Sequence, residues 1–535
     1  MSNDGSKILN YTPVSKIDEI VEISRNFFFE KQLKLSHENN PRKKDLEFRQ
    51  LQLKKLYYAV KDHEEELIDA MYKDFHRSRI ESVLSETTKL MNDVLHLIEI
   101  LPKLIKPRRV SDSSPPFMFG KTIVEKISRG SVLIIAPFNF PLLLALAPLA
   151  AALAAGNTIV LKPSELTPHT AVVMENLLTT AGFPDGLIQV VQGAIDETTR
   201  LLDCGKFDLI FYTGSPRVGS IVAEKAAKSL TPCVLELGGK SPTFITENFK
   251  ASNIKIALKR IFFGAFGNSG QICVSPDYLL VHKSIYPKVI KECESVLNEF
   301  YPSFDEQTDF THMIHEPAYK KVVASINSTS GSKIVPSKIS ISLDTEDLCL
   351  VPPTIVYNIG WDDPLMKQEN FAPVLPIIEY EDLDETINKI IEEHDTPLVQ
   401  YIFSDSQTEI NRILTRLRSG DCVVGDTVIH VGITDAPFGG IGTSGYGNYG
   451  GYYGFNTFSH ERTVFKQPYW NDFTLFMRYP PSSAQKEKLV RFAMERKPWF
   501  DRNGNNKWGL RQYFSLSAVV ILISTIYSHC SSWWT

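Results

Sequence analysis

The N-terminal part of the chain carries hydrophobic residues at a helical spacing. From residue 17 to residue 107, apolar side chains recur every three or four positions, and charged side chains occupy most positions between them. The sequence Asn39-Asn40-Pro41 interrupts this pattern, and Pro107 with the following SDSSPP ends it. The pattern therefore predicts a helical segment with one loop near residue 40.

From residue 122 onward, short β-rich runs alternate with helical runs. The β-rich runs read SVLIIAP, NTIVLKP, LIQVVQG, FDLIFYTG and CVLELGG. This alternation predicts an α/β fold, in which helices cover both faces of a parallel sheet. A second α/β segment follows Glu236, and a Gly- and Tyr-rich stretch from Phe438 to Gly454 separates it from the C-terminal tail.

Two apolar runs require a choice between the protein core and a membrane. The run from Leu142 to Ala155 contains Pro148 and lies between two predicted strands, so we expect a buried helix. After Arg511, by contrast, no charged residue occurs through Thr535, and the segment from 486 to 511 has a net charge of +5. About 20 apolar residues span a bilayer, and a basic flank keeps its side cytosolic.

The C-terminal run therefore predicts a membrane tail anchor on a cytosolic body. The membrane could be the endoplasmic reticulum, the mitochondrial outer membrane or the surface of a lipid droplet. The central apolar stretch YFSLSAVVILISTIY is short, so an interfacial or hairpin mode stays open, as does a tail helix docked on the body.

Composition narrows the classes of protein. The chain has 535 residues, of which 43% are hydrophobic and 22% charged, so it can form a large core. Its net charge of −5 gives no sign of nucleic-acid binding. The seven cysteines are scattered, which predicts reduced thiols and no metal site or disulfide framework. The N-terminus lacks the pattern of a secretory signal.

Two predicted strand ends carry residues suited to a dinucleotide. Gly214, Ser215 and Gly219 lie in the strand-to-helix turn FYTGSPRVG, where phosphate oxygens can approach N–H groups at a helix N-terminus. Lys162 and Glu165 follow the run NTIVL, at the edge where open α/β sheets bind ligands, and can hydrogen-bond ribose hydroxyls. Separately, each feature also fits a tight turn or a surface ion pair.

Three further residues form a candidate catalytic set. Cys273 lies in GAFGNSGQICVSPDY, where preceding glycines allow the thiol to stand in a cleft. Glu236 ends an apolar strand, where burial can raise a carboxyl pKa and suit it to general-base catalysis. Asn139, in APFNFP, offers a neutral amide donor for an oxyanion. Separately, each residue is also typical of a structural cysteine or a strand-end cap.

Taken together, these motifs resemble the aldehyde dehydrogenase superfamily. PFNFP, LKPSE, FYTGSPRVG, LELGGK and GQICVSPDY occur in the family's order, and QENFAPVLPI and PFGGIGTSGYG add to the match. FNTFSHER and RYPP look like the class 3 branch, and the apolar tail narrows the resemblance to membrane-bound fatty aldehyde dehydrogenases.

The resemblance implies a mechanism and a cofactor. Cys273 would attack the aldehyde, Asn139 would hold the oxyanion, and Glu236 would activate the water that releases the acid. Lys162 and Glu369 would hold ribose hydroxyls of the cofactor, and Phe371 would pack beside the nicotinamide. NAD is the expected cofactor, with NADP as the alternative, because Glu165 would repel a 2′-phosphate.

The resemblance also implies an architecture: a Rossmann-like domain, an α/β catalytic domain and a small β element that builds a homodimer. The boundaries expected are a helical part at 1–110, a bridging β element at 111–135, a dinucleotide-binding domain at 136–236, a catalytic domain at 237–435, a bridging arm at 436–485, a basic linker at 486–511 and the tail anchor at 512–535.

Two positions depart from the family pattern, and several functions stay open. Gly425 stands where asparagine is expected, and Tyr449-Gly450-Gly451 stands where Tyr-His-Gly is usual, which leaves the pocket shape open. We expect oxidation of long-chain fatty aldehydes. The alternatives are aromatic or medium-chain aldehydes, transfer of the acyl group to coenzyme A and a non-catalytic membrane scaffold.

Overall fold

The computed structural model describes residues 8–111, 117, 119–341, 348–472, 475–496 and 498–507. Five helices form the N-terminal segment: α1 (Ile17–Ser36), α2 (Pro41–Asp62), α3 (Glu64–Phe75), α4 (Arg79–Ser82) and α5 (Thr88–Leu104). A π-helical turn, η3 (Val83–Thr87), joins α4 to α5. The helical prediction is confirmed, and Pro41 begins α2 as the loop near residue 40 requires.

A six-stranded sheet follows, in the order β15-β7-β6-β3-β4-β5. Its strands are β3 (Ser131–Ile135), β4 (Thr158–Lys162), β5 (Ile188–Val190), β6 (Leu209–Gly214), β7 (Cys233–Leu237) and β15 (Gly445–Tyr446). β3 to β7 pair in parallel, and β15 joins β7 in the antiparallel direction. The predicted parallel sheet is therefore present, with a late strand added at one edge.

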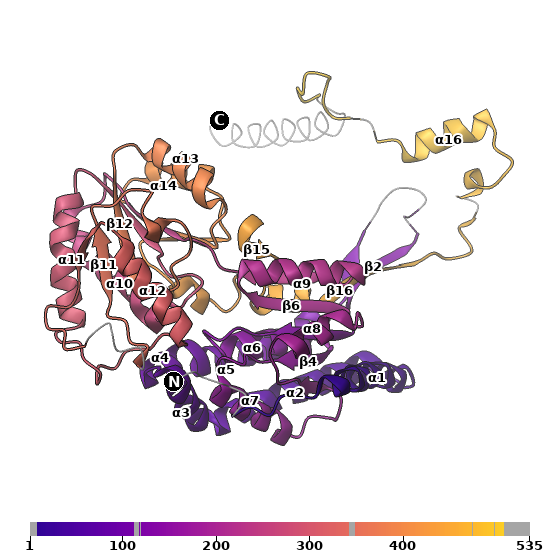
Figure 1. Ribbon diagram of the computed structural model, residues 1–535. Coiled ribbons are helices and arrows are strands. Elements are labelled where there is room, and N and C mark those ends of the chain that lie inside the picture. Colours follow the sequence, from indigo (N-terminus) through magenta and orange to yellow (C-terminus); the bar gives the residue numbers. More distant parts are fainter. Residues whose placement is uncertain are drawn as a thin grey trace, which may run out of the picture. The chain divides into compact units, whose positions relative to one another are not determined.

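Helices cover both faces of this sheet (Figure 1). Val132 and Ile134 of β3 belong to the core shared with α6 (Leu143–Ala155), α2 and α5, whereas Leu133 and Ile135 face the core shared with α1, α8 (Ile195–Asp203) and α9 (Pro216–Lys228). This alternation follows from the two-residue period of a strand. The remaining helix of this region is α7 (Pro168–Thr180). Every residue from Leu144 to Ala155 is buried, so the expected buried helix is confirmed.

A seven-stranded sheet forms the second half of the body, in the order β10-β11-β12-β9-β8-β13-β14. The strands are β8 (Pro242–Ile245), β9 (Tyr278–His282), β10 (Ser332–Ile334), β11 (Thr354–Tyr357), β12 (Val374–Tyr380), β13 (Val399–Phe403) and β14 (Asp421–Val424). Its helices are α10 (Ile254–Phe266), α11 (Tyr286–Phe300), α12 (Glu316–Ser328), α13 (Leu383–His394) and α14 (Gln407–Arg416). α10 and α11 pack on one face, and α13 and α14 pack on the other.

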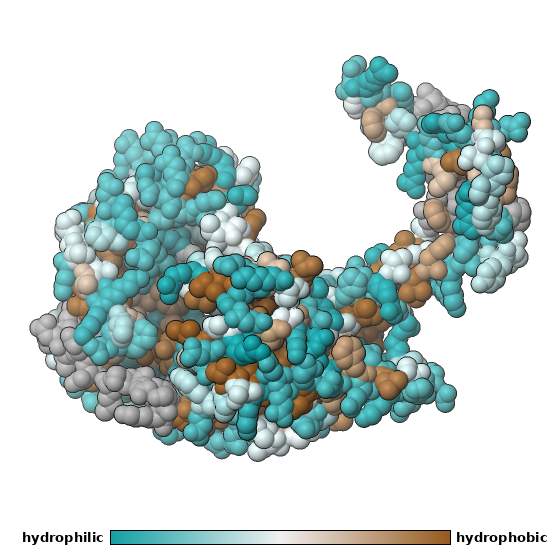
Figure 2. All heavy atoms as spheres, turned by 45° about the vertical axis from the view of Figure 1, so that its right-hand side comes forward, coloured by the Kyte–Doolittle hydropathy of each residue, from teal (hydrophilic) through white to brown (hydrophobic). Residues whose placement is uncertain are grey.

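The chain divides into two compact units. One contains the residues up to Lys106 together with Lys126–Arg462, and the other contains Pro107–Glu125 together with the residues from Thr463 onward. A three-stranded sheet in the order β1-β2-β16 consists of β1 (Arg108–Val110), β2 (Lys121–Ser128) and β16 (Ser459–Lys466). α15 (Gly451–Thr457) precedes β16, and α16 (Ala484–Met494) lies in the second unit. Hydrophilic side chains cover most of the face seen in Figure 2, with small hydrophobic groups among them.

Strand membership differs from the expected bridging element in two places. β1 lies before residue 111 and belongs to the three-stranded sheet. β3 lies before residue 136 but pairs with β4 and β6, because its mostly apolar sequence, buried at all five positions, suits a strand covered on both faces.

Among the described residues, no helix is long and apolar enough to cross a membrane. The expected tail anchor at 512–535 lies outside the described residues.

Candidate active site

The carboxyl ends of β3, β4, β6 and β7 meet along one edge of the six-stranded sheet, where a cavity of about 1020 Å³ opens. Asn139 follows β3, Lys162 ends β4, Gly214 ends β6, and Glu236 lies near the end of β7. The cavity lining also includes Glu165, Ser215, Cys273, Glu369 and Phe371. The structure thus brings together every predicted site residue except Gly219.

Gly219 has a packing role in this structure. It lies in α9, and a Cβ added there would meet Cδ2 of Leu237 in β7 at 2.6 Å. The glycine therefore lets the helix approach the strand closely, as the third glycine of a dinucleotide turn does.

The cradle for a dinucleotide is built from a helix N-terminus and a paired lysine. Ser215 caps α9 by accepting a hydrogen bond from the Val218 N–H, at 3.4 Å, and the N-terminal turn of α9 lines the cavity. The buried Lys162 ammonium forms an ion pair with the Glu165 carboxylate. Phosphate and ribose hydroxyls suit these groups, so the cavity fits a nicotinamide dinucleotide.

Glu369 and Phe371 approach the same cavity from the catalytic half. Burial, together with the charge of Asp277, raises the pKa of Glu369 to about 8. The Phe371 ring packs edge-on against Phe138, with ring centroids 6.0 Å apart. A buried ion pair between Asp277 and Lys240, which the sequence motifs did not indicate, fixes the segment that carries Glu369 and Phe371. Asp277 also accepts a hydrogen bond from the Asn370 N–H, at 2.8 Å.

Cys273 follows a tightly bent segment. After α10, Asn268, Ser269 and Gly270 all have a left-handed backbone, with φ of 49°, 54° and 67°. Burial first, and then the charges of Glu369 and Glu236, raise the pKa of the Cys273 thiol to about 12. The thiol is therefore protonated at neutral pH in this environment, and its attack on a carbonyl requires removal of that proton.

Glu236 is buried, and among the described residues neither of its carboxylate oxygens has a hydrogen-bond partner. Burial raises the pKa of Glu236 well above its usual value, and the charge of Asp421 raises it further. A carboxyl group with a raised pKa is suited to accept a proton near neutral pH.

Within the described ranges, the Asn139 amide donates one hydrogen bond through its nitrogen. Its Nδ2 donates to the backbone carbonyl of Gln271, at 3.0 Å. Because a primary amide carries two hydrogens, the second can serve an oxyanion formed next to Cys273.

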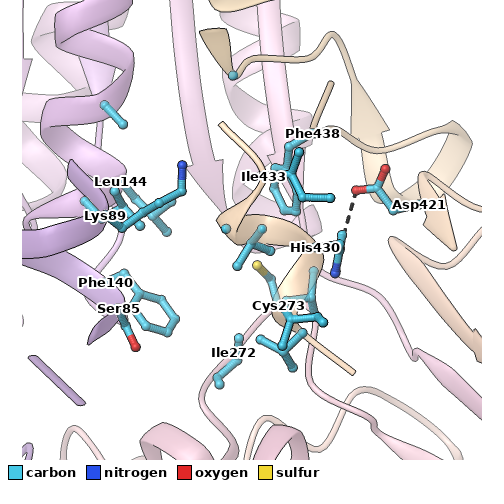
Figure 3. A pocket seen from close by; sticks show the side chains of 18 of the residues that line it. Ser85, Lys89, Phe140, Leu144, Ile272, Cys273, Asp421, His430, Ile433 and Phe438 are labelled. Atoms are coloured by element: carbon cyan, nitrogen blue, oxygen red, sulfur yellow. Dashed lines mark ion pairs between the residues drawn. The ribbon is translucent and has the colours of Figure 1, made fainter. Parts of the chain in front are cut away.

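A second cavity of about 600 Å³ reaches Cys273 and Glu236 from another side. In Figure 3 its walls include Phe140, Leu144, Ile272, Ile433 and Phe438. Cys273 and Glu236 also line the first cavity, so the two reactive side chains stand where an apolar chamber and a dinucleotide cleft meet.

Two polar residues of the apolar cavity were missed at the sequence level. His430 Nε2 lies 3.6 Å from Asp421 Oδ2 (Figure 3). Neither imidazole nitrogen has a hydrogen-bond partner among the residues that the structure describes. Burial lowers the pKa of His430 to about 4 and raises the pKa of Asp421 to about 6. At neutral pH the contact therefore joins a neutral imidazole to a carboxylate. Neither residue lies in a glycine-rich or strand-end motif that marked the other site residues.

A sequence model of the aldehyde dehydrogenase family matches residues 30–464. The chain belongs to the aldehyde dehydrogenase family. It is 97% identical to fatty aldehyde dehydrogenase HFD1 of Saccharomyces cerevisiae, over 99% of this chain and 100% of that protein. It is 37% identical to 4,4'-diaponeurosporen-aldehyde dehydrogenase of Staphylococcus aureus, over 80% of this chain and 91% of that protein.

A solved structure of the family shows the same fold. The substrate-bound state of Staphylococcus aureus AldH superposes with a TM-score of 0.80 at 34% identity, covering 89% of this chain and 99% of that chain. Members of this family are enzymes that use NAD or NADP, which agrees with the dinucleotide cleft described above.

The two departures from the aldehyde dehydrogenase pattern differ in whether they line the apolar cavity. Gly450 and Gly451 line the apolar cavity and have φ of 107° and 44°, a region where side chains are disfavoured. Gly425 is outside the cavity lining, and its carbonyl accepts a hydrogen bond from Arg260. The Tyr449-Gly450-Gly451 sequence therefore changes the chamber wall, whereas Gly425 does not.

Proposed function

We propose that this chain oxidises long-chain fatty aldehydes to fatty acids at a membrane surface. The observation that carries the proposal is the position of Cys273 and Glu236 between an apolar chamber and a dinucleotide cleft. The high identity to a fatty aldehyde dehydrogenase supports the substrate class. Each methylene buried in the chamber would contribute about 0.8 kcal/mol to binding of an alkyl chain.

The first chemical steps use Cys273 and Asn139. The Glu236 carboxylate accepts the proton of the Cys273 thiol and releases it to solvent. The Cys273 Sγ then forms a bond to the aldehyde carbon, and the carbonyl oxygen becomes an oxyanion that accepts from the Asn139 amide. Mutagenesis of such donors indicates about 2.7–4 kcal/mol of transition-state stabilisation. A bound nicotinamide dinucleotide supplies the hydride acceptor. Loss of hydride from the tetrahedral carbon leaves a thioester on Cys273.

Release of the product uses Glu236. The carboxylate takes a proton from water, the water oxygen attacks the thioester carbon, and the C–S bond breaks. The proton held by Glu236 returns to the Cys273 sulfur, so the thiol and the carboxylate are both restored. In the part of the chain that the structure describes, no group forms a hydrogen bond to the Glu236 oxygens, which leaves them available to a water molecule.

The test is NADH production from hexadecanal by the full-length protein. Cys273→Ala should abolish turnover, whereas Cys204→Ala, a matched change in a thiol at the C-terminal end of α8 and outside both cavity linings, should not. A series from propanal to hexadecanal and benzaldehyde would separate the fatty substrate from medium-chain and aromatic ones. Wild-type turnover confined to benzaldehyde would overturn the long-chain proposal.

NAD is the cofactor that the cleft favours. The Glu165 carboxylate, paired with Lys162, lines the cleft, and the 2′-phosphate of NADP would meet this negative charge if the ribose binds beside it. NADP stays the alternative, and steady-state kinetics with both cofactors would decide.

Membrane attachment is a separate part of the proposal. The basic stretch before the apolar run includes α16, a helix with no buried residue, in which Phe492 is 90% exposed. An isolated 11-residue helix is marginal in water, and a basic helix with exposed apolar residues gains from an anionic lipid surface. Carbonate extraction of membranes carrying the full chain tests attachment, and release into the soluble fraction would count against an anchor.

A homodimer is also proposed. β16 lies at one end of the three-stranded sheet and exposes most of its side chains. Such an edge pairs readily with a second chain. Light scattering of the detergent-solubilised protein would show a dimer mass, and a monomer at micromolar concentration would exclude it.

A further inference from the structure

A fully buried arginine connects the loop that carries Asn139 with the loop that carries Cys273. Arg77 lies between α3 and α4 and has no exposed surface. None of the motifs that indicated the active site includes it. Its side chain contacts the loops that carry Asn139 and Cys273 and, among the residues described, forms no surface ion pair.

All five N–H groups of the guanidinium have an acceptor. Nε and Nη2 donate to Oδ1 of Asn268, at 3.1 and 2.5 Å, and Nη2 also donates to the backbone carbonyl of Asn139. Nη1 donates to the Glu86 carboxylate and, at 3.9 Å, to Sδ of Met71. A lysine ammonium has three donors on one nitrogen, so it cannot reproduce this planar set.

Two aromatic rings hold the plane of the guanidinium. Its central carbon lies 4.6 Å from the ring centroid of Phe75 and 4.7 Å from that of Phe140. Phe140 follows Asn139 directly and lines the apolar cavity. Rotation of the guanidinium would therefore disturb the loop that carries Asn139.

Glu86 fixes the same loop from its other end. The side chain lies in the π-helical turn η3 and is fully buried. One carboxylate oxygen pairs with Arg77, and the other accepts from the backbone N–H groups of Leu142 and Leu143, at 3.1 and 2.7 Å. The Arg77–Glu86 pair thus spans the segment from residue 139 to the start of α6.

Asn268 carries the connection into the nucleophile loop. Its Nδ2 donates to the backbone carbonyls of Asn139 and Gln271, at 3.1 and 3.0 Å. The Asn139 amide donates to the same Gln271 carbonyl. Asn268 starts the left-handed segment that leads to Cys273, a conformation that persists only when its surroundings impose it.

We propose that Arg77 is a positioning residue that sets the Asn139 amide against the Cys273 thiol. The proposal rests on the proposed catalytic roles of Asn139 and Cys273. It assigns Arg77 an effect on the steps in which the oxyanion forms, and little effect on cofactor or aldehyde binding.

The test compares full-length Arg77→Lys with the double variant Arg77→Met/Glu86→Gln, which removes both buried charges and so limits the cost to folding. Arg79→Lys is the matched control, because Arg79 pairs with Glu65 on the surface. We expect kcat to fall about 100-fold in both Arg77 variants, as for loss of an oxyanion donor. The KM values should stay within about twofold, and the control should match wild type.

A double-mutant cycle with Asn139→Ala separates positioning from general stability. If Arg77 acts through Asn139, adding Arg77→Lys to Asn139→Ala should lower kcat little further. The first-turnover rate of NADH formation should show the same lack of additivity.

Two results would overturn the proposal. One is a kcat within about threefold of wild type in the Arg77 variants with only the melting temperature lowered, and the other is a fully additive cycle. If Asn139→Ala itself kept wild-type kcat, the oxyanion role of Asn139 would fail, and with it any action of Arg77 through that amide. If kcat fell in Asn139→Ala but not in Arg77→Lys, the oxyanion role of Asn139 would stand and the positioning role of Arg77 would fail.

Discussion

Glu236 and Asp421 line the same apolar cavity, and the charge of Asp421 adds to burial in raising the pKa of Glu236. The pKa of the proposed general base, Glu236 in β7, therefore depends on a second carboxyl group, that of Asp421. Like charges brought together in this way favour the protonated form of one partner.

Asp421→Asn should move the acid limb of the pH–kcat profile to lower pH. Glu236 acts as a base only when deprotonated, so activity rises with pH through its pKa. Removing the neighbouring negative charge lowers that pKa and lets the base form at lower pH. The measurement is kcat for hexadecanal from pH 5 to 9. Asp426→Asn, outside the cavity, is the control and should leave the profile in place.

Glu236→Gln should raise the melting temperature while it abolishes turnover. The pKa of this carboxyl is raised in the folded state, so the folded protein binds a proton more tightly than the unfolded chain. Stability from this group is therefore present at low pH and lost as pH rises toward the folded pKa. The gain from glutamine should be larger at pH 8 than at pH 5. Scanning calorimetry at both values tests this, and an equal shift at both would contradict the expected sign.

Glu165→Gln should relax the preference between cofactors. A negative charge beside the ribose disfavours a 2′-phosphate, and its removal should raise the ratio of kcat/KM for NADP over NAD about tenfold, equivalent to about 1.4 kcal/mol. The carboxylate's partner, Lys162, remains in place. Ser164→Ala provides a neighbouring change without charge, and a similar rise there would mean that loop geometry rather than charge sets the ratio.

Ile433→Ser should penalise long aldehydes selectively. Ile433 projects into the apolar chamber in Figure 3 and is 60% exposed, so the change should cost little stability. Loss of its contact with an alkyl chain should reduce kcat/KM for hexadecanal about fivefold, roughly 1 kcal/mol. Propanal, whose alkyl chain has only two carbons, should be affected much less. Ile256→Ser on the exposed side of α10 is the control, and equal losses for both aldehydes would contradict the prediction.

The sequence predicted those site residues whose position in the fold follows from a local pattern. Asn139, Lys162, Ser215 and Glu236 each follow or end an apolar strand, and parallel strands end at one edge, so their convergence could be predicted. The helical N-terminal segment and the buried helix α6 were likewise visible from spacing and length.

Other residues could not be found in this way. Arg77 lies in a link between helices, Asp421 begins the short strand β14, and His430 lies in a 3-10 turn after that strand. All three reach the site through contacts between distant segments, which no local spacing records. Gly219 shows the converse case, because a motif glycine can serve helix packing rather than the ligand.

The late strand β15 has a consequence for how the chain is built. β15 pairs with β7, and Phe455 and Phe458 belong to the core shared with α2, α5 and α6. The dinucleotide half therefore lacks an edge strand and part of its interior until the segment near residue 458 has been synthesised. During translation, the helices and strands before residue 237 must wait for more than two hundred further residues. The dinucleotide half therefore completes its fold only after the strands of the seven-stranded sheet have been synthesised, which departs from the usual order in which the N-terminal domain folds first.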